Sequence, residues 1–312
     1  FAKKKVFIHE LQGSVFVNKW NDAFATIACL SLAGLPAFNI FVSEWALFTV
    51  AYTFSPAILV MGIFAALLLF VMYYKTRGIF LKQIRYSDTS AVLRIYTEEF
   101  GLQAYMVKGL HQKKSKLKPA LFQPLSMLEL IVSHKEKASL QHIREAKPAR
   151  IFNSSANILK NSVILFLNEL LFKSLQEEES NPQLFNFIYN SLEWMDEQKD
   201  LSSLYHLKGS IELSKYLGFY PEGKLTPSRP AFDLGGGSFS PDPGMFAEEF
   251  ITGEPAVLFS KLIETERGML KEIKVSGAVR RELLEKILLY YQVHIPSAKD
   301  FKSHKILHEI LK

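Results

Sequence analysis

Four lysines lie within six residues of a segment that is flanked by Gly109 and Pro119, and their side chains could bind phosphate groups. They are Lys113, Lys114, Lys116 and Lys118. Glycine and proline at the two ends favour a loop over a helix or strand. A cluster of lysines contacts nucleic-acid phosphates through charge and carries no information about base identity. The segment therefore predicts a cationic loop that binds nucleic acid, with simple surface solvation as the alternative.

Other side chains near this lysine loop could extend a binding groove. Lys82, Arg85 and Lys108 are further cations close to it in the sequence. Aromatic side chains in the same region could stack on bases, which contributes about 1–3 kcal/mol per base without sequence preference. The candidates for stacking are Tyr86, Tyr96, Tyr105 and Phe122. For each aromatic residue, packing in a hydrophobic core is the alternative interpretation.

The net charge of the chain is unevenly distributed. The 312 residues carry a formal charge of +6. Residues 72–150 hold fifteen basic and six acidic residues, whereas residues 151–312 hold eighteen basic and twenty-two acidic residues. Residues 1–71 are nearly neutral, with four basic and three acidic residues. A basic field confined to one segment is typical of a protein that binds nucleic acid or an anionic surface.

The basic segment is predicted to form a small β-barrel. Short runs rich in β-branched and aromatic residues alternate with turn signals such as Ser87-Asp88 and Gly109. The expected strands are 77–85, 91–96, 102–108, 126–133 and 140–145. Five short strands in about 75 residues fit an OB-like barrel, a fold that commonly binds single-stranded nucleic acid.

Residues 151–312 are predicted to be helical. Asn153 or Ser154 could cap the first helix, and Asn181-Pro182 is typical of the start of the second. Further helices are expected from about residue 201, near 255–266, and over 276–293 and 300–311. A polar, Gly- and Pro-rich break covers 221–244 and is expected to form a loop.

The sequence gives no sign of catalysis or of a bound cofactor. A single cysteine, Cys29, excludes a disulfide scaffold and a cysteine-based zinc knuckle. The glycine run that follows Asp233 lacks the preceding hydrophobic strand that a phosphate loop of the actin-like type needs. No nucleophile–base or paired-carboxylate constellation is evident. We therefore expect a non-enzymatic protein without metal or cofactor.

The first 71 residues are predicted to contain transmembrane helices. Residues 23–43 and 45–74 contain no charged residue, and each run is about as long as an apolar helix that crosses a bilayer. A buried helix of a soluble protein is the alternative. Glu44 lies between the two runs and is expected to be an intramembrane carboxylate, because such groups are costly and usually functional.

Residues 31–45 resemble the broken-helix signature of antiporter-like membrane subunits in complex I and membrane hydrogenases. Gly34 and Pro36 would interrupt the helix, and Glu44 matches the ionisable intramembrane residue of that family. The resemblance implies a membrane subunit fragment of a proton-translocating complex, and this is the alternative function. Because the chain begins at Phe1, we expect its upstream end to be truncated.

Residues 72–312 resemble the RecO family of bacterial recombination mediators. The resemblance rests on the order and spacing of several short motifs: Tyr-Lys-Thr-Arg-Gly-Ile-Phe-Leu-Lys at 74–82, Tyr-Ser-Asp-Thr at 86–89, Tyr-Thr-Glu-Glu-Phe-Gly at 96–101 and Leu-Phe-Gln-Pro at 121–124. It implies a protein that binds single-stranded DNA, anneals complementary strands and assists recombinase loading. The implied partners are a RecR-like protein, the single-strand-binding protein and the RecA recombinase. Many members carry a four-cysteine zinc knuckle near 221–244, so this chain is expected to have a metal-free loop there.

Together these observations predict an α+β protein in three parts. Residues 1–71 would form N-terminal transmembrane helices, 72–150 an OB-fold domain that binds single-stranded DNA, and 151–312 an all-α helical domain. The expected function is DNA repair and recombination mediation, with a cytoplasmic location for 72–312 and membrane association through 1–71. A membrane-tethered repair protein and a mis-joined reading frame are two further interpretations of the abrupt change at residue 72.

Overall fold

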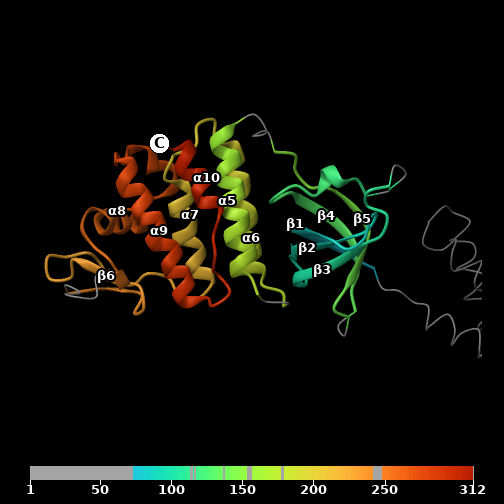
Figure 1. Cartoon of the computed structure of the whole chain (residues 1–312), viewed down its shortest axis with the longest axis horizontal. Coiled ribbons are helices and arrows are strands. Elements are labelled where there is room, and N and C mark those ends of the chain that lie inside the picture. Colours follow the sequence, from blue (N-terminus) through green and yellow to red (C-terminus); the bar gives the residue numbers. More distant parts are fainter. Residues whose placement is uncertain are drawn as a thin grey trace, which may run out of the picture. The chain divides into compact units, whose positions relative to one another are not determined.

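The computed structural model describes residues 73–112, 115, 117–135, 138–152, 157–176, 179–241 and 248–311. The described residues belong to one compact unit, Met72–Lys312. Five strands come first along the chain, and helices with a small second sheet follow (Figure 1).

The first five strands close into a barrel, so the predicted OB-like barrel is confirmed. They are β1 (Tyr73–Arg85), β2 (Ala91–Thr97), β3 (Gly101–Val107), β4 (Met127–Ser133) and β5 (Gln141–Pro148). Neighbouring strands pair in the order β1-β2-β3-β5-β4, and β4 pairs with β1 to complete the ring. The pairing is antiparallel except for a short parallel contact between β3 and β5.

Strand β1 belongs to both sides of the barrel. Its first half pairs with β4 and its second half with β2, and the register shifts between Phe80 and Lys82. Gly78 lies where the two halves meet. A Cβ atom there would lie 2.7 Å from Cδ1 of Leu130 and 2.8 Å from Cγ2 of Ile95. Closure of the barrel around β1 therefore requires a residue without a side chain at this position.

The prediction of N-terminal transmembrane helices is corrected. Among the described residues, none of the helices combines the length and the apolar character needed to cross a membrane. The predicted spans 23–43 and 45–74 fall, up to residue 72, outside the described residues, as does Glu44. The fold that the structure supports is a barrel followed by a helical domain.

Six α-helices form most of the second half of the described chain. They are α5 (Ile158–Ser174), α6 (Pro182–Glu197), α7 (Tyr205–Tyr216), α8 (Gly253–Glu264), α9 (Gly277–His294) and α10 (Ser303–Ile310). Helix α6 begins as predicted, because Asn181 accepts a hydrogen bond from the backbone N–H of Leu184 and Pro182 follows it. Helix α5 begins later than predicted. Its N-cap is Asn157, which accepts from Lys160, and Asn153 and Ser154 lie outside the described residues.

The Gly- and Pro-rich segment 221–244 contributes two strands to a small sheet, which corrects the expectation of a plain loop, and the third strand follows the segment. Strands β6 (Ala231–Asp233), β7 (Ser238–Ser240) and β8 (Phe250–Ile251) pair in the order β7-β6-β8. An aromatic cluster packs beneath them: the ring of Phe232 lies 5.2 Å from that of Phe239 and 4.7 Å from that of Phe259. These short strands therefore depend on a hydrophobic contact with α8.

The barrel and the helical domain share one hydrophobic core. Ile79, Leu81 and Tyr96 of the barrel pack in the same buried cluster as helices α5 to α7. At its edge, the guanidinium of Arg77 on β1 lies 4.6 Å from the ring centre of Tyr189 on α6. The helical domain consequently covers one part of the outer barrel surface and leaves another part open.

Candidate nucleic-acid interface

The candidate interface is the uncovered outer surface of β2, β3 and the second half of β1. We call it the β2–β3 wall and define it by Lys82, Ile84, Val92, Arg94, Met106 and Lys108. Strand pairing places Lys82 opposite Arg94, and Arg94 opposite Ala104. The next row along the strands holds Ile84, Val92 and Met106. Residues directly opposite one another in antiparallel strands share a face, so a cationic row lies beside an apolar row.

These residues point outward because the alternate positions fill the barrel. Leu93, Ile95 and Tyr105 are fully buried in the interior cluster of the barrel. Successive strand residues face opposite sides, so Val92, Arg94 and Met106 must face away from that interior. Ile84 is 46% exposed, which is unusual for an isoleucine. The wall is therefore an accessible surface with apolar character at its centre.

The helical domain sets the boundary of the β2–β3 wall. Tyr96 lies on the same outer surface of β2, but its ring is buried and lies 6.0 Å from that of Phe185 on α6. The ammonium of Lys82 lies 4.4 Å from the ring centre of Phe172 on α5. Lys82 is thus held at the edge of the helices by a cation–π contact, and the open surface begins beside it.

The cations of the wall are available to an anionic ligand. Among the described residues, no carboxylate pairs with Lys82, Arg94 or Lys108. Lys108 is exposed directly after β3. Arg85 differs, because its guanidinium lies 3.1 Å from the carboxylate of Asp88. Both of these side chains are largely exposed, so a phosphate group can compete with this weak surface ion pair.

Of the four predicted stacking residues, only Tyr86 is accessible. It is 69% exposed in the turn after β1. Tyr96 packs against the helical domain, and Tyr105 is buried inside the barrel, where burial raises the pKa of its hydroxyl. Phe122 is also buried, with its ring 5.7 Å from that of Phe80. The core-packing alternative therefore describes these three residues, because no base can reach their rings.

The lysine loop is only partly described. Lys113, Lys114 and Lys116 lie outside the described residues, and Lys118 is exposed. The ends of the loop are anchored by Leu110 and Leu117, both buried in the barrel core. Ser115 donates a hydrogen bond to the carbonyl of Leu117 at 2.8 Å. The loop is thus tied to the same barrel that carries the β2–β3 wall.

Sequence reasoning missed four members of the wall. Arg94 is the single charged residue within β2, and Ile84, Val92 and Met106 look like ordinary core residues in their strands. The signal for Arg94 was present, because a charge between two inward-facing apolar residues indicates an outward position. The three apolar residues carry no such signal, since an apolar side chain suits either face.

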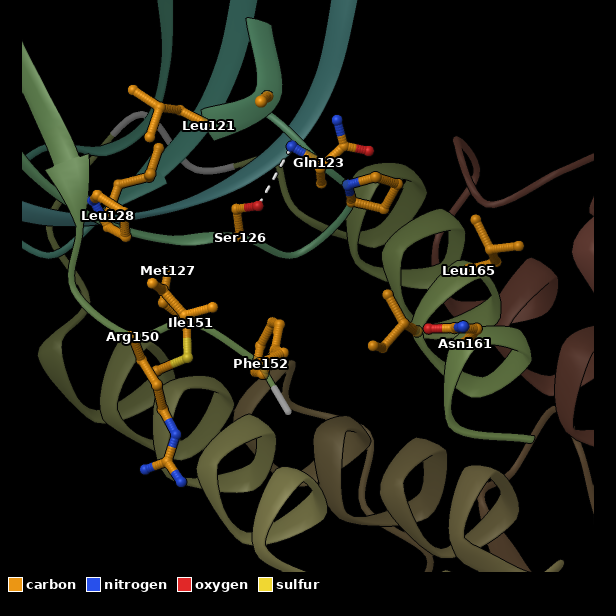
Figure 2. Close-up of a pocket in the computed structure, with 14 residues that line it drawn as sticks. Leu121, Gln123, Ser126, Met127, Leu128, Arg150, Ile151, Phe152, Asn161 and Leu165 are labelled. Atoms are coloured by element: carbon orange, nitrogen blue, oxygen red, sulfur yellow. Dashed lines mark hydrogen bonds between the residues drawn. The ribbon is translucent and has the colours of Figure 1, made fainter. Parts of the chain in front are cut away.

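A hollow lies between the barrel and α5, and its lining is apolar where the β2–β3 wall is cationic. It has a volume of about 440 Å³ and is lined mainly by apolar side chains, among them Met127, Phe152 and Leu165 (Figure 2). Its only charged lining residue is Arg150, which Figure 2 shows pointing toward a neighbouring helix. That guanidinium lies 3.3 Å from the buried carboxylate of Asp196 on α6. Arg150 therefore joins the two domains and is not directed at a ligand.

The described part of the chain contains no candidate metal site. Among these residues, no group of three or more histidine, cysteine, aspartate or glutamate side chains could hold a metal ion. The charged residues of the β2–β3 wall are the cations Lys82, Arg94 and Lys108. An arrangement of cations beside exposed apolar side chains favours binding of a flexible polyanion with exposed bases.

The family models and the individual relatives that match this chain belong to the same family. The family model for the N-terminal part of recombination protein O matches residues 72–152, and the model for its C-terminal part matches 155–304. The DNA repair protein RecO of Flavobacterium psychrophilum is 34% identical over 241 residues, which cover 77% of this chain and 99% of the relative. The same protein of Flavobacterium johnsoniae is 34% identical over 243 residues, with the same coverage. That of Bacteroides fragilis is 30% identical over 240 residues.

Both family models match only residues after 71. The resemblance of 31–45 to antiporter-like membrane subunits gains no support from these comparisons, and neither does the alternative of a proton-translocating subunit. The matched residues contain both the barrel and the helical domain.

Proposed function

Because the chain belongs to the RecO family of DNA repair proteins, we propose that its barrel binds single-stranded DNA along the β2–β3 wall. Its role is that of a DNA repair and recombination mediator. The observation that carries the binding proposal is the row of Lys82 and Arg94 beside the apolar row of Ile84, Val92 and Met106. The cations attract phosphates, and the apolar row offers a surface to unstacked bases.

Residues 72–150 would act as the DNA-binding domain and 151–312 as the supporting helical domain. The lysine loop, with Lys113, Lys114, Lys116 and Lys118, would add phosphate contacts beside the wall, and Arg85 and Tyr86 would extend it. The excess of nine positive charges on 72–150 supports this division, because an electrostatic contribution dominates sequence-independent binding. The mediator role would then be non-enzymatic.

Bound single strands are the substrate for the further steps that we propose. The protein would anneal complementary strands and assist recombinase loading together with a RecR-like protein, the single-strand-binding protein and RecA. Membership of the family supports these partners. A protein that acts on bacterial chromosomal DNA works in the cytoplasm, and we propose that compartment for residues 72–312.

A direct binding experiment tests the proposal. Fluorescence anisotropy of a labelled single-stranded oligonucleotide would be followed at low salt for the wild-type protein and for the variant Arg94→Ala/Lys108→Ala. We expect tight binding by the wild type and binding by the variant that is weaker by roughly tenfold. A wild-type protein that leaves the anisotropy unchanged would refute the proposed function. Equal affinities of the two proteins would refute its placement on the β2–β3 wall.

A further inference from the structure

A second cationic surface lies on the other side of the barrel. Strands β4, β5 and the first half of β1 surround a hollow of about 670 Å³. We call this surface the β4–β5 wall and define it by Tyr73, Lys75, Glu129, Arg144 and Lys147. The charged residues that line the hollow are three cations, Lys75, Arg144 and Lys147, and two carboxylates, Glu129 and Glu145, together with Leu117 at the end of the lysine loop. The sequence analysis predicted none of these wall residues to bind a ligand.

One carboxylate in this hollow is shared by two lysines. An oxygen of Glu129 lies 3.1 Å from the ammonium of Lys147 and 3.7 Å from that of Lys75. The side chains of both lysines are largely exposed, at 70% and 76%. A single negative charge can neutralise only one of the two ammonium groups. The pair therefore retains an excess positive charge that a phosphate oxygen can satisfy.

The third cation of the wall forms a flat platform with an aromatic ring. The guanidinium of Arg144 lies 4.6 Å from the ring centre of Tyr73, which is 49% exposed. Its Nε also lies 3.7 Å from a carboxylate oxygen of Glu145, and both side chains are largely exposed, so a phosphate group can compete with this weak surface ion pair. Arg144 occupies the β-bulge of β5, since Glu145 pairs with Ile131 while Ile143 pairs with Val132. A bulge redirects the side chain of its extra residue. Here it places a guanidinium over an aromatic ring, a combination on which a nucleic-acid base can stack.

The strand order keeps the two walls apart. In the ring β1-β2-β3-β5-β4, strands β2 and β3 form one side and β5 and β4 the other. β1 contributes its second half to the first wall and its first half to the second wall. A strand of DNA on one wall therefore leaves the other wall accessible. Leu117 brings the end of the lysine loop to the hollow of the β4–β5 wall.

We propose that the β4–β5 wall binds a second single strand of nucleic acid through Lys75, Lys147 and the Arg144–Tyr73 platform. One barrel then holds two strands at once, one on each wall. This inference rests on the proposed function, because it assumes that the first strand lies on the β2–β3 wall. It explains how the protein can promote annealing, since two strands held on one small barrel meet at a far higher effective concentration than free strands.

Two readouts on the full chain separate the two walls. Anisotropy reports the binding of one labelled oligonucleotide. Energy transfer between two non-complementary oligonucleotides, one with a donor and one with an acceptor dye, reports the simultaneous binding of two strands. The annealing rate of a complementary pair is followed in the same way. The test variant is Lys75→Ala/Arg144→Ala/Lys147→Ala, and the charge-matched control is Lys224→Ala/Lys271→Ala/Lys274→Ala, which removes three exposed lysines of the helical domain.

We expect the test variant to bind a single oligonucleotide within about twofold of the control, but to lose energy transfer and anneal at least about tenfold more slowly. Glu129→Gln removes the shared carboxylate and should increase both energy transfer and the annealing rate. A test variant that binds two strands and anneals them like the control would overturn the inference. Annealing would then not need the β4–β5 wall, as when two protein molecules each bring one strand. A variant that loses all binding would overturn it too, because the walls would then not be separate. If the wild type binds no oligonucleotide, the proposed function itself fails.

Discussion

Both carboxylate oxygens of Glu98 accept hydrogen bonds from the guanidinium of Arg77, at 2.8 Å from Nε and 2.6 Å from Nη2. The same guanidinium donates a third hydrogen bond to the side-chain oxygen of Asn186 on α6, at 3.0 Å. Arg77 lies on β1 and Glu98 in the turn between β2 and β3, so one arginine ties two segments of the barrel to the helical domain. Together with the shared hydrophobic core, this contact joins the barrel to α6.

Replacing Glu98 with glutamine should make stability less dependent on pH. The hydrogen bonds from Arg77 hold the pKa of the Glu98 carboxyl below its ordinary value. A lowered folded-state pKa stabilises the protein above the unfolded-state pKa, and this contribution disappears as the pH falls through the folded value. Both side chains are partly exposed, so we expect Glu98→Gln to cost only about 1 kcal/mol at neutral pH. Urea unfolding of both proteins at neutral pH and at about pH 3 measures how this cost in unfolding free energy changes with pH. A cost that is the same at both values contradicts the account.

Adding one methyl group at Gly78 should destabilise the barrel. A Cβ atom would come within 2.7 Å of Leu130 and 2.8 Å of Ile95, both in the barrel core. Overpacking of this kind costs about 1–3 kcal/mol, so the unfolding midpoint of Gly78→Ala should fall. The matched control is Gly268→Ala, because nothing lies within 4 Å of a Cβ atom there. If both variants unfold at the same urea concentration, the close approach at Gly78 is refuted.

His206 should make the protein less stable in mild acid. It is buried on α7, and desolvation, followed by repulsion from Arg280 and His308, lowers its pKa to about 3. The histidine is therefore protonated below about pH 6.5 in the unfolded state but stays neutral in the folded state. The free energy of unfolding is unaffected by this residue above that pH and decreases as the pH falls below it. Between pH 7 and pH 5 we expect a loss of about 2 kcal/mol from this residue. His206→Gln should remove that part of the pH dependence. Unfolding free energies of both proteins at the two pH values decide the matter, and identical pH slopes would exclude the prediction.

The barrel and most helices could be predicted because their signals are local. A short run rich in β-branched and aromatic residues indicates β2, and Asn181-Pro182 indicates the start of α6. The small sheet of β6, β7 and β8 could not be predicted, since strands of two or three residues are too short to show alternation. Its stability comes from contacts such as that between Phe232 and Phe259, which no local pattern reveals.

The candidate site was predicted in part for the same reason. Charge along the sequence pointed to Lys82 and Lys108, which the structure leaves exposed beside Arg94. The aromatic candidates depended on tertiary structure. Tyr96 points outward from the barrel, yet it is buried because Phe185 of α6 packs against it. Such coverage involves residues far apart in the chain and cannot be derived from strand alternation.

Removing the lysine loop charges should weaken DNA binding equally for all sequences. The variant changes Lys113, Lys114, Lys116 and Lys118 to alanine. Lysine contacts with phosphates carry no base information, so the loss in affinity should be the same for oligonucleotides of different composition. Anisotropy titrations with pyrimidine-rich and purine-rich strands would measure this. Unchanged affinity at low salt would exclude the loop from the interface, and a loss confined to one composition would show that it reads bases.

The salt dependence of single-strand binding tests the central claim, which is that the β2–β3 wall binds DNA phosphates. The wild type is compared with Lys82→Ala/Arg94→Ala/Lys108→Ala and with the control Lys224→Ala/Lys271→Ala/Lys274→Ala. Each phosphate contact to single-stranded DNA contributes about 0.7 to the slope of log affinity against log salt concentration. We predict that the wall variant loses about 2 units of slope while the control keeps the wild-type value. A wall variant with the wild-type slope and affinity would contradict the account.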